Sequence, residues 1–121
     1  RLVAGFRSPE GEFVEAPHPG PVRALSPGVA HVVREAMVRA VEAGTGVRAR
    51  LPGIAVAGKT GTAENPHGRP HAWFIGFAPA RSPRYAFAIV VENGGSGGAV
   101  AAPVARAFLA RMLLSGSEGD H

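Results

Sequence analysis

Residues 57–64 read Ala-Gly-Lys-Thr-Gly-Thr-Ala-Glu, and they include Lys59, the only lysine of the chain. The other twelve residues that carry a fixed positive charge are all arginines. Lysine has a compact ammonium group whose proton affinity responds to its surroundings, whereas arginine has a wide planar guanidinium group. Thr60 and Thr62 flank Gly61, so two hydroxyl groups and an unobstructed backbone lie beside the lysine charge. This stretch predicts an anion-binding segment.

Two geometries are open for this segment. Residues 53–60 fit the phosphate-loop pattern of glycine, four residues, glycine, lysine and threonine, which predicts nucleotide binding by Gly53 to Thr60. That motif needs a strand before its first glycine and a helix that begins at its lysine. Here a proline precedes Gly53, the intervening residues 54–57 are typical of a strand, and Gly61 follows Thr60. We therefore keep the phosphate loop only as the alternative.

The favoured geometry places Lys59 to Thr62 on an edge strand. Side chains alternate along a strand, so Thr60 and Thr62 face the same way while the backbone stays free to pair with an extended peptide. Gly61 removes the side chain that would block close approach. The two hydroxyl groups, together with the lysine charge, suit a terminal carboxylate. This geometry predicts a site that binds the C-terminus of a peptide.

A helix is predicted before this segment. Ser26 suits its N-cap, Pro27 its first position and Gly44 its end. Apolar residues recur between them at intervals of three and four, which predicts one continuous stripe that covers a core. The stripe consists of Val29, Val32, Val33, Ala36, Met37, Ala40 and Val41.

Two strands and a second helix are predicted after the segment. His71 to Ala78 and Arg84 to Glu92 have short connections, which favour an antiparallel meander with the lysine strand. The last strand is apolar on both faces, so we expect both faces to be buried. Gly94 to Gly98 is expected to be a flexible connector, with an anion-binding nest at a helix start as the less favoured alternative. An apolar helical stripe runs from Ala101 to Met112.

The ends of the chain are less regular. Leu2 to Phe6 and Glu12 to Glu15 flank a predicted turn at residues 8–11, so an N-terminal ribbon is expected. Ser115 to His121 is a polar, glycine-containing tail that we expect to be frayed. The predicted fold class is α+β, with a three-strand antiparallel meander and an N-terminal ribbon flanked by helices.

Composition limits the function further. The chain has 121 residues, 45% of them hydrophobic, which suits one small domain, and it has no cysteine. The formal net charge is +4, but the arginines are scattered and few aromatic residues lie among them, so no nucleic-acid partner is expected. No stretch approaches the roughly 20 apolar residues that are needed to cross a bilayer, so we expect this part of the protein to make no membrane contact. His67 and His71 lack a third ligand nearby, so neither a metal nor another cofactor is expected.

The lysine segment and its surroundings resemble the C-terminal part of the transpeptidase domain of a class B penicillin-binding protein, a family related to the serine β-lactamases. The matching stretches are residues 57–64, residues 72–79 (Ala-Trp-Phe-Ile-Gly-Phe-Ala-Pro), residues 89–93 (Ile-Val-Val-Glu-Asn) and Gly44-Thr45-Gly46 after the first helix. The resemblance implies that residues 1–114 are the C-terminal third of such a domain. The chain also begins like the middle of a folded unit, so we expect a fragment.

This resemblance implies a parent enzyme, a peptidoglycan D,D-transpeptidase that crosslinks stem peptides ending in D-Ala-D-Ala and is acylated by β-lactams. Lys59 would supply positive potential around the nucleophile, and Thr60 and Thr62 would bind the substrate carboxylate. Gly61 would let the substrate lie along the strand, and the Thr62 backbone N–H would be one of two oxyanion donors. The parent is expected to be membrane-anchored and extracytoplasmic.

The nucleophile of that family is missing from this chain. None of the six serines has a lysine three residues later, and no Ser-x-Asn triplet occurs. Both motifs precede the lysine motif in the family, so the chain alone is predicted to be inactive, with the missing N-terminal part of the domain as its partner. Asn65 to Pro70 would border the cleft, which makes His67 and Arg69 candidates for substrate contact. A non-catalytic binding or assembly fragment remains a further alternative.

Overall fold

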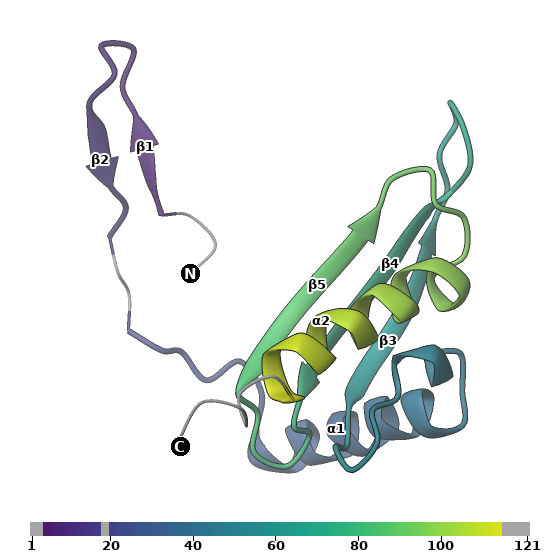
Figure 1. Cartoon of the computed structure of the whole chain (residues 1–121). Helices are drawn as coiled ribbons and strands as arrows, with labels where there is room; N and C mark the ends of the chain where they lie inside the picture. Colours follow the sequence, from purple (N-terminus) through teal and green to yellow (C-terminus); the bar gives the residue numbers. More distant parts are fainter. Residues whose placement is uncertain (1–3, 18–19, 115–121) are drawn as a thin grey trace, which may run out of the picture.

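The computed structural model describes residues 4–17 and 20–114. It contains a β-hairpin and a three-stranded antiparallel sheet with two main helices, which confirms the predicted α+β class. Figure 1 shows the hairpin standing apart from the sheet and helices. The elements are β1 (Gly5–Arg7), β2 (Phe13–Glu15), α1 (Pro27–Glu42), η1 (Val47–Ala49), β3 (Ala57–Ala63), β4 (His71–Ala78), β5 (Tyr85–Val91), η2 (Gly97–Ala101) and α2 (Ala102–Leu114).

The central sheet has the order β3-β4-β5, with both neighbouring pairs antiparallel. The predicted meander is therefore confirmed, and β3 lies at one edge. Thr60 pairs with Phe74, Gly61 with Trp73, and Thr62 with Ala72. Because paired residues point to the same side of a sheet, this register determines what each side chain of the lysine segment meets.

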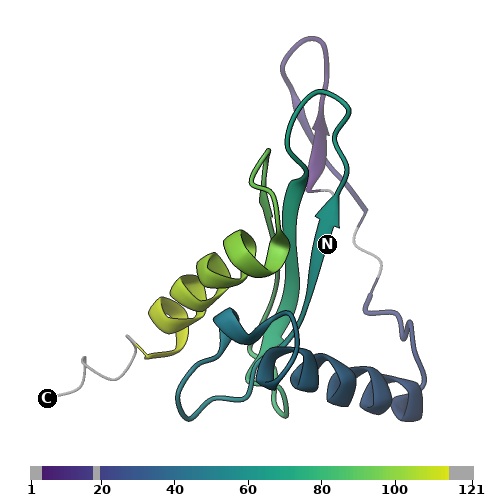
Figure 2. The ribbon, with the colours of Figure 1, turned by 90° about the vertical axis from the view of Figure 1, so that its right-hand side faces the viewer.

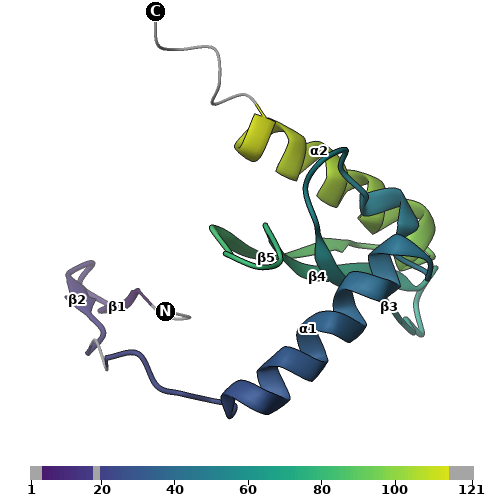
Figure 3. The same ribbon diagram turned by 90° about the horizontal axis from the view of Figure 1, so that it is seen from below.

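One face of the sheet carries the core. Phe74 is fully buried on this face, as is Leu109 of α2. Figure 3 shows α2 lying over this side of the sheet. Small residues let η2 and α2 come close to the sheet, because Ala101 of η2 and Ala102 and Ala105 of α2 are also fully buried. The buried core residues come from the end of α1, the segment from η1 to the start of β3, β4, η2 and α2.

The opposite face of the sheet is open. Trp73, Ile75 and Val90 are 39%, 47% and 47% exposed. Ala86 and Ala88 of β5 are exposed as well, so the expectation that the last strand is buried on both faces is wrong for this chain. The reason is that β5 is an edge strand and α2 covers only one side. Figure 2 shows α2 along one side of the sheet, while α1 points away from it on the other.

The first helix begins as the sequence predicts. Ser26 is the N-cap, its Oγ accepts a hydrogen bond from the Val29 N–H at 3.4 Å, and Pro27 is the first helical residue. The predicted apolar stripe, however, is covered only at its C-terminal end. Val41 is 2% exposed, whereas Val32 is 66% exposed. A stripe defined by helical spacing gives the direction of a core but not how far that core extends.

The glycine-rich stretch before α2 differs from the expectation of a flexible connector. Gly97 begins a π-helical turn, η2, that continues directly into α2, and both Gly95 and Gly97 are buried. The resulting continuous helix, Gly97–Leu114, is long and apolar enough to cross a membrane by length and composition, with a mean hydropathy of 1.3. The expectation that no stretch of the chain is long and apolar enough to cross a bilayer is therefore corrected. Core helices of soluble proteins pass the same test, and this one packs on β4 through its alanines.

The N-terminal ribbon is confirmed. Strand β1 pairs antiparallel with β2, with Gly5 opposite Glu15 and Arg7 opposite Phe13. The turn is closed by the Gly11 N–H, which donates to the Ser8 carbonyl oxygen at 2.9 Å. The start of the predicted first strand at residues 2–3 and the predicted frayed tail, Ser115 to His121, lie outside the described residues.

Candidate functional site

The lysine segment lies within the edge strand β3. Residues 57–63 are extended and paired with β4 along their whole length. A phosphate loop would need a helix that begins at Lys59, and the chain instead continues as a strand to Ala63. The alternative of a nucleotide-binding loop at Gly53 to Thr60 is therefore wrong.

Side-chain alternation divides the lysine segment between the two faces of the sheet. Lys59 is exposed on the open face, opposite Ile75, whereas Thr60 and Thr62 lie on the face that α2 covers. The two threonines therefore face the same way, as the period of two along a strand predicts, and the lysine lies on the opposite face. The Lys59 ammonium turns back toward the strand and donates to the Thr60 carbonyl oxygen at 2.5 Å.

Thr60 is held by a residue to which the sequence analysis gave no role. Its Oγ1 lies 2.6 Å from the Oγ1 of Thr45, which follows the end of α1. Thr60 is only 9% exposed, and it is the one buried polar side chain among the described residues. Buried hydroxyl groups need a partner, and Thr45 supplies it. In the sequence, the only signal for this partner is a threonine between two glycines, Gly44-Thr45-Gly46, directly after the predicted helix.

Thr62 is exposed, and its hydroxyl also has a partner. Its Oγ1 accepts a hydrogen bond from the Gly97 N–H at 3.4 Å, at the start of η2. This contact occupies a lone pair of the oxygen and leaves the hydroxyl hydrogen free to donate to another group. Gly97 is the second residue that the sequence analysis missed, because its contact with β3 joins segments 35 residues apart.

Two glycines allow close approach of backbones around the strand. A Cβ on Gly97 would lie 2.3 Å from the Gly61 carbonyl oxygen and 2.5 Å from the Trp73 carbonyl oxygen. A Cβ on Gly61 would lie 3.2 Å from the Cβ of Trp73, on the open face. The turn η2 therefore rests directly on the β3 and β4 backbones at the level of Gly61.

The loop after β3 is tied to the loop after β5. The Asn65 side-chain amide donates to Asn93 Oδ1 at 2.6 Å, and the Asn93 backbone N–H donates to His71 Nδ1 at 3.0 Å. His67 and Arg69, the candidates for substrate contact, are both exposed on this loop. Across residues 4–17 and 20–114, no group of three or more His, Cys, Asp or Glu side chains is arranged to hold a metal ion.

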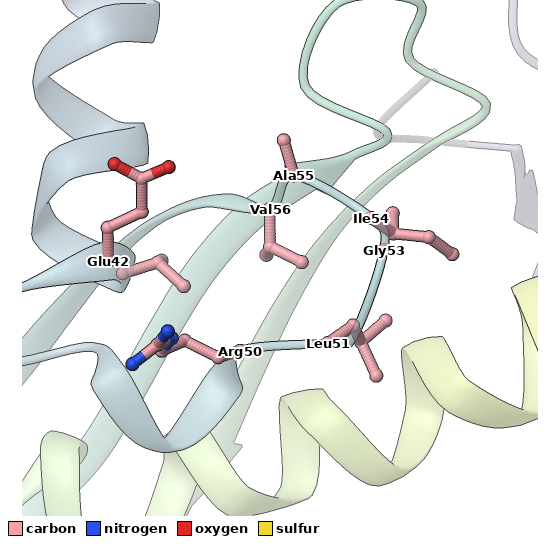
Figure 4. Close-up of a pocket in the computed structure, with 8 residues that line it drawn as sticks. Glu42, Arg50, Leu51, Gly53, Ile54, Ala55 and Val56 are labelled. Carbon is pink, nitrogen blue, oxygen red and sulfur yellow. The ribbon is translucent and has the colours of Figure 1, made fainter.

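A separate cavity of about 240 Å³ lies before β3 and does not include the lysine segment. Figure 4 shows Glu42 from the end of α1 and Arg50 on one side of it, with Gly53 to Val56 around the other. These lining residues precede Ala57, so the cavity lies beside the beginning of the strand. The candidate site remains the edge strand β3 with its partners Thr45 and Gly97.

Comparison with known proteins places this strand in a family. The family model of the penicillin-binding protein transpeptidase domain matches residues 8–110. Peptidoglycan D,D-transpeptidase PbpA of Mycolicibacterium smegmatis is 41% identical over an alignment that covers 96% of this chain and 26% of that protein. PbpA of Mycobacterium tuberculosis is 46% identical over 100 residues, which cover 75% of this chain and 20% of that protein.

Solved structures agree with the sequence comparisons. Penicillin-binding protein A from M. tuberculosis, in a ceftriaxone acyl-enzyme complex, superposes with a TM-score of 0.71 at 39% identity and covers 91% of this chain. The D,D-transpeptidase domain of a peptidoglycan glycosyltransferase from Eggerthella lenta gives a TM-score of 0.69 at 37% identity and covers 93% of this chain. The chain spans 27% of the length of each of these two structures. It belongs to the family of penicillin-binding-protein transpeptidase domains.

Proposed function

We propose that this chain carries the carboxylate-binding and oxyanion strand of a peptidoglycan D,D-transpeptidase, and that residues 1–114 are the C-terminal third of its transpeptidase domain. The observation that carries the proposal is the position of Lys59-Thr60-Gly61-Thr62 on β3, the terminal strand of the sheet, where Lys59 and Thr62 are exposed. An edge strand offers its backbone to a second extended chain. The proposed substrate is a stem peptide ending in D-Ala-D-Ala, with β-lactams as acylating analogues.

Each residue of the segment has a proposed role. Thr62 donates its free hydroxyl hydrogen to the substrate carboxylate, and Thr60 contributes a second hydroxyl group beside it on the same face. Gly61 keeps the strand edge clear for the substrate. Lys59 lies on the open face and supplies positive electrostatic potential to the nucleophile on that face.

Strand parity supports the oxyanion role of Thr62. In an antiparallel ladder, every second residue of an edge strand directs its N–H and C=O away from its partner. The Thr60 carbonyl oxygen accepts the Lys59 ammonium, which supports an outward direction for this residue's backbone groups. Thr62 has the same parity, so its N–H points to the open edge, where an acyl oxyanion is stabilised.

The nucleophile belongs to a part of the domain that covers the open face. Lys59 shares this face with Trp73, Ile75 and Val90, whose side chains are more than a third exposed. Contiguous apolar surface of this kind marks an interface. Because peptidoglycan lies outside the cytoplasm, we place the complete domain there, on a membrane-anchored parent. Without the nucleophile this chain forms no acyl-enzyme.

Labelling with fluorescent penicillin tests this proposal. We expect no covalent label on this chain, and we expect a stable label on the polypeptide extended upstream to the complete domain, because acylation needs the missing serine. The measurement is in-gel fluorescence after denaturation, with an excess of unlabelled penicillin as the competition control. Labelling of the chain alone would contradict its predicted inactivity. An upstream coding sequence with no Ser-x-x-Lys motif would contradict the transpeptidase function itself.

A further inference from the structure

The backbone on both sides of Thr45 packs tightly against the end of α1, while Thr45 itself is exposed. The Gly44 and Gly46 N–H groups both donate to the Ala40 carbonyl oxygen, at 3.2 Å and 2.9 Å. A Cβ on either glycine would lie close to the same oxygen, at 2.9 Å for Gly44 and 3.1 Å for Gly46. The chain therefore folds tightly back on the helix end, and only the middle residue of the three has room for a side chain.

The backbone of Thr45 is also held from the side of η2. A Cβ on Gly98 would lie 2.6 Å from the Thr45 carbonyl oxygen, so η2 packs directly against it. Arg48 in η1 donates to the Ala99 carbonyl oxygen at 3.3 Å and ties the two turns together. Thr45 thus lies where α1, β3 and η2 meet, and its hydroxyl group faces Thr60.

The chemistry of the two hydroxyl groups gives the bond between them a direction. A hydroxyl group has one hydrogen to donate, and an ionised carboxylate can only accept. If Thr60 binds a carboxylate, its hydrogen is committed to that carboxylate. The hydrogen in the 2.6 Å bond must then come from Thr45. The pair forms a short chain in which Thr45 donates to Thr60 and Thr60 donates to the ligand.

We propose that Thr45 is a positioning residue for carboxylate recognition, which acts by donating to Thr60 Oγ1 and so aiming the Thr60 hydroxyl hydrogen at the substrate. The inference rests on the proposed function. Without this bond, Thr60 would be a hydroxyl group that is 9% exposed and free to rotate. With it, one rotamer is selected before the ligand arrives, which lowers the entropic cost of binding.

The test compares two variants of Thr45 in the complete domain, with two ligands that differ only in the carboxylate. Thr45→Val keeps the shape but removes the hydroxyl group, whereas Thr45→Ser keeps the hydroxyl group. The ligands are penicillin G and its methyl ester. We expect Thr45→Val to lower the second-order acylation rate constant for penicillin G roughly three- to tenfold. The rate constant for the ester should stay unchanged, and Thr45→Ser should behave like the unmodified domain.

A double-mutant cycle with Thr60→Val completes the test. If Thr45 acts through Thr60, Thr45→Val causes no further loss once the Thr60 hydroxyl is absent. Equal losses for penicillin G and its ester would show a structural effect and overturn the inference, as would a Thr45→Val domain that reacts normally with both. Those results leave the proposed function intact. An unmodified domain that penicillin G does not acylate contradicts the proposed function, and the inference falls with it.

Discussion

Replacing Lys59 by methionine is expected to lower the acylation rate of the complete domain by penicillin at least ~100-fold, the loss typical when a group that stabilises the developing charge is removed. Lys59 is the only lysine of the chain and projects from the edge strand on the open face. No other side chain of the segment carries a positive charge, so nothing within it can replace the ammonium group. The measurement is the second-order rate constant for acylation by a fluorescent penicillin.

The same substitution should leave folding unchanged, which separates a chemical effect from a structural one. Lys59 is exposed, and its one hydrogen bond within β3 is made to the neighbouring Thr60 carbonyl oxygen. We expect the melting temperature of the Lys59→Met chain to stay within about 2 °C of the unmodified chain, because surface substitutions typically change stability by less than about 0.5 kcal/mol.

Lys59→Arg is the matched control for charge alone. It keeps the positive charge but replaces a compact ammonium group with a planar fork. We expect this variant to regain only part of the lost rate. An acylation rate for Lys59→Met close to that of the unmodified domain would show that the lysine has no role in the chemistry.

The sequence predicted those elements whose signals are local. Ser26 and Pro27 marked the beginning of α1, and the short connections between apolar runs marked the meander. The edge position of β3 agrees with the geometry that the sequence analysis favoured over the phosphate loop. Each of these predictions needed only a few neighbouring residues.

What could not be predicted depends on contacts between distant segments. Thr45 and Thr60 are 15 residues apart, and nothing local tells that their hydroxyl groups meet at 2.6 Å. The predicted burial of the α1 valines is wrong for a related reason. An apolar stripe gives the direction of a core, but it does not identify the segment that covers the stripe. The glycine run before α2 forms the packed turn η2 and not a flexible connector, and its sequence alone does not separate the two, because glycine suits both equally well.

Gly97→Ala is expected to destabilise the chain by about 2–3 kcal/mol, at the upper end of the cost of overpacking. The added Cβ would lie 2.3 Å from the Gly61 carbonyl oxygen and 2.5 Å from the Trp73 carbonyl oxygen. Both atoms belong to the backbone of paired strands and cannot rotate away as a side chain would. The turn η2 must therefore move off the sheet, and the measurement is the free energy of unfolding from urea denaturation.

Gly28→Ala is the matched control, because it makes the same chemical change near the start of the other main helix. A Cβ on Gly28 would meet nothing within 4 Å. Alanine is the better helix former, so this variant should be as stable as the unmodified chain or up to about 1 kcal/mol more stable. In the complete domain, Gly97→Ala should also slow acylation by penicillin, since moving η2 breaks the bond from the Gly97 N–H to Thr62 Oγ1. If Gly97→Ala matched Gly28→Ala in both stability and acylation, the close packing of η2 on β3 would have no energetic consequence, and the placement of Thr62 would not depend on it.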